Sequence, residues 1–191
     1  MAPFQSRPLA ALDDLALARM AARDERDASE ELVRRAAGRV GDLLRRMGAG
    51  HALADDVTQD AMVTALRSLA GYRGEAAFAT WAMKIAARLY LRRRAKEARF
   101  VLMDEPVEPT HTGPSPEVAS NARLDLDRAL AQLSEPERLC VSMCHGAGLT
   151  QEEIATSLSM PLGTVKSHVT RGLKKLRTLM IAEPAGSDAD E

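Results

Sequence analysis

The residues best suited to chemistry lie between positions 162 and 180, where basic and hydroxyl side chains surround an apolar stripe. At helical spacing the stripe comprises Val165, Val169, Leu173, Leu176 and Met180. The opposite face then carries hydrogen-bond donors and positive charge. The side chains able to meet base edges in a DNA groove are Thr164, Lys166, Ser167, His168 and Arg171. Further along, contacts to phosphates, which position a protein without reading sequence, suit Lys174, Lys175 and Arg177.

A short helix and a tight turn would position this basic helix. Thr150 and Glu153 have the spacing of a capping box, which fixes the start of a helix over residues 151–158. Pro161 suits the first turn of the next helix, because its missing N–H is not needed there. Helices joined so closely must cross steeply, as in a helix-turn-helix whose second helix enters the major groove. The alternative, an ordinary solvated basic helix, does not explain why the charge coincides with the cap and the turn.

A second basic segment, residues 84–99, carries seven Lys or Arg and one acid. In a helix predicted over residues 76–98, Lys84, Arg88 and Arg92 recur every fourth residue on one face. This face is expected to attract the phosphates of DNA.

Most of the aromatic residues of the chain lie beside the second basic segment: Tyr72, Phe78, Trp81 and Tyr90. Aromatic rings near cations stack on unpaired bases, with a gain of about 1 to 3 kcal/mol per base. Phe78 and Trp81 begin an apolar helical stripe, so we predict that they belong to the core. Tyr72, Arg73 and the loop over residues 71–77 are the better candidates for contacting bases.

Three acceptor residues, Asp56, Gln59 and Asp60, would share one face of a helix predicted over residues 53–69. Such a face suits a basic partner surface. Asp55 is expected to help cap the start of this helix. The alternative is a solvated acidic helix start stabilised by the helix dipole.

A proline-rich acidic stretch divides the chain. Residues 101–117 hold four prolines and four acids and show no apolar periodicity, which disfavours a helix or a packed strand. We therefore predict an all-α protein of two small helical domains, over residues 1–100 and 118–182, joined by this linker and followed by an acidic tail over 183–191. The remaining helices are predicted over 12–22 and 28–47 in the first domain, and over 118–132, 135–145 and 162–180 in the second.

Composition and motifs argue against several other classes of protein. Two cysteines cannot form a disulfide framework and the N-terminus lacks a signal core, so we expect a cytoplasmic protein. No apolar run approaches the roughly 20 residues that cross a bilayer, so we expect no membrane insertion. No catalytic constellation or phosphate loop stands out, so we expect neither an enzyme nor a cofactor. Cys140, Cys144 and His145 offer too few ligands for a metal site, and the two thiols suit a core.

Five segments carry a family resemblance. Residues 149–155 (LTQEEIA), 163–168 (GTVKSH) and 171–177 (RGLKKLR) resemble the minus-thirty-five domain of bacterial sigma factors, although LuxR-type regulators share a related helix-turn-helix. Residues 54–60 (ADDVTQD) and 72–81 (YRGEAAFATW) resemble the core-binding and minus-ten segments of extracytoplasmic-function (ECF) sigma factors of the sigma-70 family. Two matched domains in the right order favour the sigma factor.

The resemblance implies a function and partners for the residues named above. It implies that Asp56, Gln59 and Asp60 bind the clamp helices of the beta-prime subunit of core RNA polymerase. It also implies that the two basic helices recognise the minus-ten and minus-thirty-five elements of promoter DNA, for a stress or envelope-response regulon. An anti-sigma factor is a further expected partner.

Arg88 and Arg92 depart from the family pattern, which usually has Asn and Asp there, so the preferred minus-ten sequence cannot be transferred. Two alternatives stay open. One is a sigma-like decoy that occupies an anti-sigma factor, and the other is a dimeric helix-turn-helix regulator.

Overall fold

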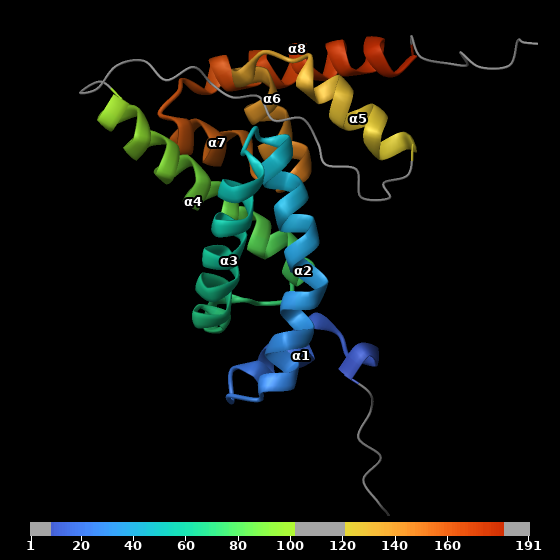
Figure 1. The fold of residues 1–191 in the computed structure, drawn as a ribbon, viewed down its shortest axis with the longest axis vertical. Coiled ribbons are helices and arrows are strands. Elements are labelled where there is room, and N and C mark those ends of the chain that lie inside the picture. The colour runs from blue at the N-terminus through green and yellow to red at the C-terminus, as the bar shows by residue number, and fades with distance from the viewer. Residues whose placement is uncertain (1–8, 102–120, 182–191) are drawn as a thin grey trace, which may run out of the picture. The chain divides into compact units, whose positions relative to one another are not determined.

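The computed structural model describes residues 9–101 and 121–181, and every regular element within these ranges is a helix (Figure 1). The predicted all-α class is confirmed. The described residues form two compact units, each with its own core. The predicted linker and acidic tail lie outside the described residues, except that Val101 still belongs to a helix.

The first unit is built around two long helices that pack along each other, α3 and α4. Its elements are η1 (Leu9–Ala11), α1 (Asp14–Ala21), α2 (Arg26–Arg46), α3 (His51–Arg67), η2 (Leu69–Gly71) and α4 (Phe78–Val101). Both helices carry fully buried alanines, among them Ala61 of α3 and Ala82 of α4. Small side chains let two helices approach closely, so this pair forms a firm support for the residues on its outer faces.

The second unit is a set of short helices closed by one long helix. Its elements are α5 (Asn121–Ala131), α6 (Glu135–Val141), a π-helical turn η3 (Ser142–Gly146), α7 (Gln151–Leu158) and α8 (Leu162–Ile181). Its core joins three helices and includes Leu130, Leu133, Val141 and Leu176. The burial of these side chains fixes α8 against α5 and α6.

The predicted capping box of α7 forms in the second unit. The Thr150 hydroxyl accepts a hydrogen bond from the Glu153 amide at 3.1 Å, and the Glu153 carboxylate accepts one from the Thr150 amide at 2.9 Å. Between α7 and α8, Ser159 adopts a left-handed conformation with φ of 52°. The chain therefore reverses within three residues, as the helix-turn-helix requires.

Several helix boundaries differ from the prediction by a few residues, and two of them bear on the candidate site. α3 begins at His51, so Asp55 lies in its second turn and the expectation that it caps the helix was wrong. α4 begins at Phe78 because the preceding residues form a loop in which Gly74 has a φ of +74°. Glycine adopts this conformation without a steric penalty.

Candidate nucleic-acid interface

The outer face of α8 is basic and open to solvent. Val165 and Val169 are buried, whereas Lys166, Ser167 and Arg171 are exposed. A shallow groove of about 510 Å³ on this face is lined by Lys166, Ser167, Thr170 and Arg171. Thr164 and His168 of the same helix are half-buried, and Lys174 is exposed further along. The structure thus gathers most of the predicted minus-thirty-five residues on one surface.

The buried stripe of α8 differs from the predicted one at two positions. Leu173 and Met180 are exposed, while Gly172 is buried and Leu179 packs against the core. A Cβ atom on Gly172 would lie 2.7 Å from Cγ2 of Val141, so the absence of a side chain permits the close approach of α6 and α8. The periodicity of apolar side chains missed this position because glycine has none to count.

Arg171 has partners on its own helix. Its Nε donates to the carbonyl oxygen of Ser167 at 3.3 Å, and its Nη2 lies 3.4 Å from Nδ1 of His168. These are long contacts, and the side chain is exposed. A guanidinium held this weakly can turn outward to meet a base edge or a phosphate at little cost.

Lys175 differs from its neighbours because its charge is already paired. Its Nζ donates to both carboxylate oxygens of Glu137, at 2.7 and 3.0 Å. Glu137 is only 4% exposed. The prediction of Lys175 as a phosphate contact overlooked this ion pair, which makes the residue a link between α6 and α8.

A pocket of about 410 Å³ opens beside the N-terminus of α4. Its lining combines aromatic, charged and glycine residues from the loop and the first two turns of the helix: Gly71, Tyr72, Arg73, Glu75, Ala76, Thr80, Trp81 and Lys84. The predicted minus-ten candidates Tyr72, Arg73 and Lys84 therefore lie together. The exposed Arg88 and Arg92 continue the basic face along α4.

Two aromatic residues in this region exchange the roles predicted for them. Tyr72 is only 7% exposed, because its ring packs against Phe78 and its hydroxyl donates to the Ala76 carbonyl at 2.7 Å. Its ring is therefore not free to stack on a base. This differs from the prediction, which named Tyr72 as a candidate for contacting bases. Phe78 is in the core as predicted, but Trp81 is half-exposed and lines the pocket. Trp81 thus replaces Tyr72 as the aromatic residue best placed for stacking.

The predicted acidic face forms on α3. Asp56, Gln59 and Asp60 are exposed, with 68% of the Asp56 side chain and 56% of the Asp60 side chain accessible. Arg93 of α4, which the sequence analysis did not single out, forms an ion pair with Asp60, and its Nη1 lies 3.9 Å from Oδ2 of Asp56. A basic group therefore already occupies one edge of this acidic face.

Comparisons with known proteins identify the family. The model for Sigma-70 region 2 matches residues 32–100, and the model for Sigma-70, region 4 matches residues 129–178. The ECF RNA polymerase sigma factor RpoE of Cereibacter sphaeroides is 31% identical over 167 residues, which are 84% of this chain and 91% of that protein. This chain is an ECF sigma factor of the sigma-70 family.

Other relatives of this sigma factor agree. The ECF RNA polymerase sigma factor SigE of Mycolicibacterium smegmatis is 34% identical over 154 residues, which are 78% of this chain and 60% of that protein. The structure of the sigma factor RpoE from Bartonella quintana, in complex with the anti-sigma factor NepR, has a TM-score of 0.58 at 19% identity, with 85% of this chain and 99% of that chain covered. This last likeness concerns the fold.

The matched spans contain both candidate surfaces of the sigma factor. The region 2 match includes the acidic face and the pocket, and the region 4 match includes the helix-turn-helix. The match to region 2 decides against a LuxR-type regulator. Within the described residues, no helix is long and apolar enough to cross a membrane.

The two cysteines of the sigma factor belong to the packing of the second unit. Cys140 is fully buried and Cys144 is half-buried. Burial raises the pKa of Cys140 to about 11 and also raises that of Cys144. Since the thiolate is the reactive form, this shift disfavours reactivity of Cys140, whose full burial agrees with the predicted core role. Cys144 is only partly in the core.

Proposed function

We propose that this sigma factor binds core RNA polymerase through the acidic face of α3 and directs it to promoters with two elements. The basic face of α8 enters the major groove of the upstream, minus-thirty-five element. The basic face of α4 and the Trp81 pocket hold the unpaired strand of the minus-ten element. The observation that carries this proposal is that the chain contains both sigma regions in order. The first region includes the acidic face of α3 and the basic face of α4, and the second includes the basic face of α8.

The test is transcription in vitro with purified core polymerase. Addition of this chain should produce transcripts from particular promoters, and the chain alone should not bind promoter DNA tightly at physiological salt. A decoy that only occupies an anti-sigma factor would give no transcript from any template tried. A dimeric regulator would instead bind an operator tightly without polymerase.

We also propose that an anti-sigma factor regulates this chain and that the chain acts in the cytoplasm. The Bartonella sigma factor is in complex with an anti-sigma factor, and CnrH, with a TM-score of 0.51 at 24% identity over 90% of this chain and 99% of that one, is in complex with the cytosolic domain of CnrY. A related inhibitor is therefore the expected regulator here. The cytoplasm is the expected location because core polymerase works there.

Replacement of Lys166 or Arg171 by alanine is expected to weaken use of the upstream element by about tenfold each, since a base contact contributes about 1 to 3 kcal/mol. Binding of core polymerase should be unchanged. Both effects can be measured by transcription from promoters with intact and scrambled upstream elements, and by pull-down. Arg128→Ala is the matched control, because Arg128 is an exposed cation of the same unit on α5. Equal losses for Arg128 and Arg171 would show a general effect of charge instead of groove recognition.

A further inference from the structure

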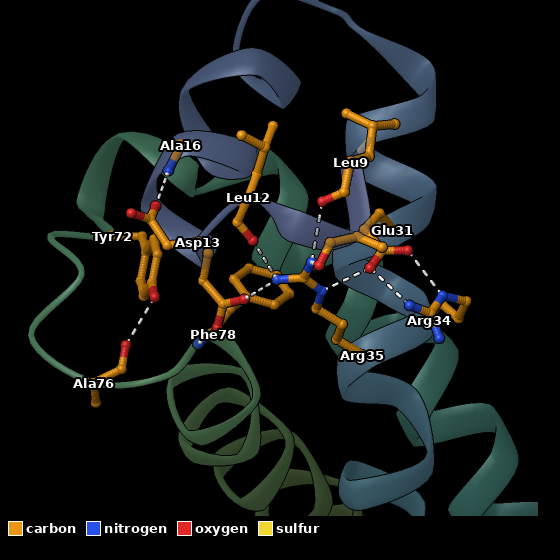
Figure 2. A network of polar contacts seen from close by, with 12 residues as sticks. Leu9, Leu12, Asp13, Ala16, Glu31, Arg34, Arg35, Tyr72, Ala76 and Phe78 are labelled. Carbon is orange, nitrogen blue, oxygen red and sulfur yellow. Dashed lines mark hydrogen bonds and ion pairs between the residues drawn. The ribbon is translucent and has the colours of Figure 1, made fainter. Parts of the chain in front are cut away.

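Arg35 of α2 uses both terminal nitrogens of its guanidinium group to hold the N-terminal segment, residues 9–14 (Figure 2). Its Nε donates to Glu31 at 2.7 Å, and Nη1 donates to the Leu12 carbonyl at 2.9 Å and to Asp14 at 3.0 Å. Nη2 donates to the carbonyls of Leu9 and Ala10 at 3.2 and 3.1 Å. All five N–H donors are thus satisfied, which only arginine with its planar fork can do.

Asp14 links Arg35 to the start of α4. Its Oδ1 binds Arg35, while its Oδ2 accepts a hydrogen bond from the backbone amide of Phe78 at 2.8 Å. Phe78 is the first residue of α4, where backbone amides have no partner within the helix and a negative charge is favourable. A carboxylate from α1 therefore acts as the cap of a helix that begins 64 residues later.

The same segment supports the loop that precedes α4. A Cβ atom on Gly74 would lie 3.2 Å from Cβ and Cδ2 of Leu15, so the loop lies directly against α1. The Tyr72 hydroxyl closes the loop through the Ala76 carbonyl, and the Tyr72 ring lies 5.4 Å from that of Trp81. Both ends of the pocket lining, the loop and the first turn of α4, are thereby fixed from α1 and α2.

We infer that Arg35 and Asp14 are positioning residues for capture of the unpaired minus-ten strand, because they hold the loop and the start of α4 in the shape that forms the Trp81 pocket. Neither residue lines the pocket. Asp14 and the carbonyls that Arg35 binds precede the region 2 match, so the N-terminal segment supports the recognition site from outside that region. A preformed pocket binds a base without the entropic cost of ordering the loop. This inference rests on the proposed function.

The test uses the full chain, alone and assembled with core polymerase, and two conservative variants. Arg35→Lys keeps the charge but replaces the planar fork by one ammonium group. Asp14→Asn keeps an oxygen acceptor but removes the charge. Arg34→Lys is the matched control, because Arg34 is the exposed neighbour on α2 and binds the same Glu31.

We expect Arg35→Lys and Asp14→Asn each to weaken binding of the assembled enzyme to a single-stranded minus-ten oligonucleotide by about tenfold, equivalent to one stacked base. The oligonucleotide is taken from a promoter that the wild type transcribes. The fluorescence emission of Trp81, the only tryptophan of the chain, should shift in the free variants. Association with core polymerase should stay at the wild-type level, and Arg34→Lys should match the wild type throughout.

The possible outcomes separate this inference from the proposed function. Wild-type oligonucleotide affinity in both variants would overturn the inference and leave the proposed function intact. A joint loss of oligonucleotide affinity and polymerase association would also overturn it, because that pattern indicates a general loss of structure. If the wild-type enzyme makes no promoter-specific transcript, both the inference and the proposed function fail.

Discussion

Replacement of Asp56 and Gln59 together by alanine is expected to lower the affinity of this sigma factor for core RNA polymerase by about 100-fold, because truncating one side of buried charged contacts at an interface costs about 2 to 5 kcal/mol. Both side chains are exposed on α3, while Val57 between them anchors the helix in the core. The change should therefore leave the fold intact. Pull-down or fluorescence anisotropy with purified core polymerase measures the affinity.

The control for this experiment is Glu30→Ala. Glu30 is an exposed carboxylate of the same unit, but it belongs to α2, where it pairs with Arg26. Its removal changes the net charge as Asp56→Ala does, and should change the affinity by less than about threefold. Unchanged binding of the double variant would remove the acidic face from the polymerase interface.

Arg93 adds a further feature to this interface. Its ion pair with Asp60 and its approach to Asp56 leave the outer part of each carboxylate accessible. An internal cation at one edge orients the two carboxylates, and a basic partner can approach from the other. The acidic face is therefore partly ordered by a contact within the chain, although much of its surface remains in water.

The fold was largely predictable because its signals are local. Apolar periodicity indicated every long helix, and the pairing of Thr150 with Glu153 fixed the start of α7. The exposed basic residues of α8 followed from the same periodicity. Such features depend on residues three or four positions apart, which a single sequence displays directly.

The features that the sequence did not reveal depend on contacts between distant residues. Arg34 and Arg35 are identical in type and adjacent, yet Arg34 is exposed and Arg35 holds the N-terminal segment with four of its N–H donors. The Tyr72 ring is buried, and its hydroxyl donates a hydrogen bond to the Ala76 carbonyl. Trp81 is therefore the more accessible of the two rings. The difference between Tyr72 and Trp81 depends on the packing of α1 against η2 and the loop, which the sequence alone does not display.

Glu137 shows how a helix cap can also hold the long helix α8 in place. Its carboxylate accepts a hydrogen bond from the Ser134 amide at 3.2 Å, as a capping box requires, and it also binds the Lys175 ammonium. The hydrogen bond from Lys175 outweighs the effect of burial and lowers the pKa of Glu137 below its usual value of 4.5. One side chain thus fixes both the start of α6 and the middle of α8.

Replacement of Glu137 by alanine is therefore expected to destabilise the second unit by about 1 to 3 kcal/mol, through loss of the cap and of a buried acceptor. Thermal unfolding followed by circular dichroism measures this change. Trp81 fluorescence reports only the first unit and should be unaffected. Glu135→Ala is the matched control, since Glu135 is an exposed acid in the same first turn. Equal destabilisation by the two variants would show that the buried ion pair contributes nothing.

Low pH should also remove the stabilisation that the charged Glu137 carboxylate gives to the second unit. Comparison with Glu137→Gln isolates the contribution of this charge. Because the folded-state pKa lies below 4.5, the charged carboxylate contributes its full stabilisation above that pH. The contribution is lost as the pH falls through the folded-state pKa, where the carboxylate is protonated in both states. The difference in stability between the wild type and Glu137→Gln should therefore be constant near neutral pH and shrink below about pH 4.5. A difference that stays constant down to the acid unfolding of the wild type would show that protonation of another carboxylate controls the stability of the second unit.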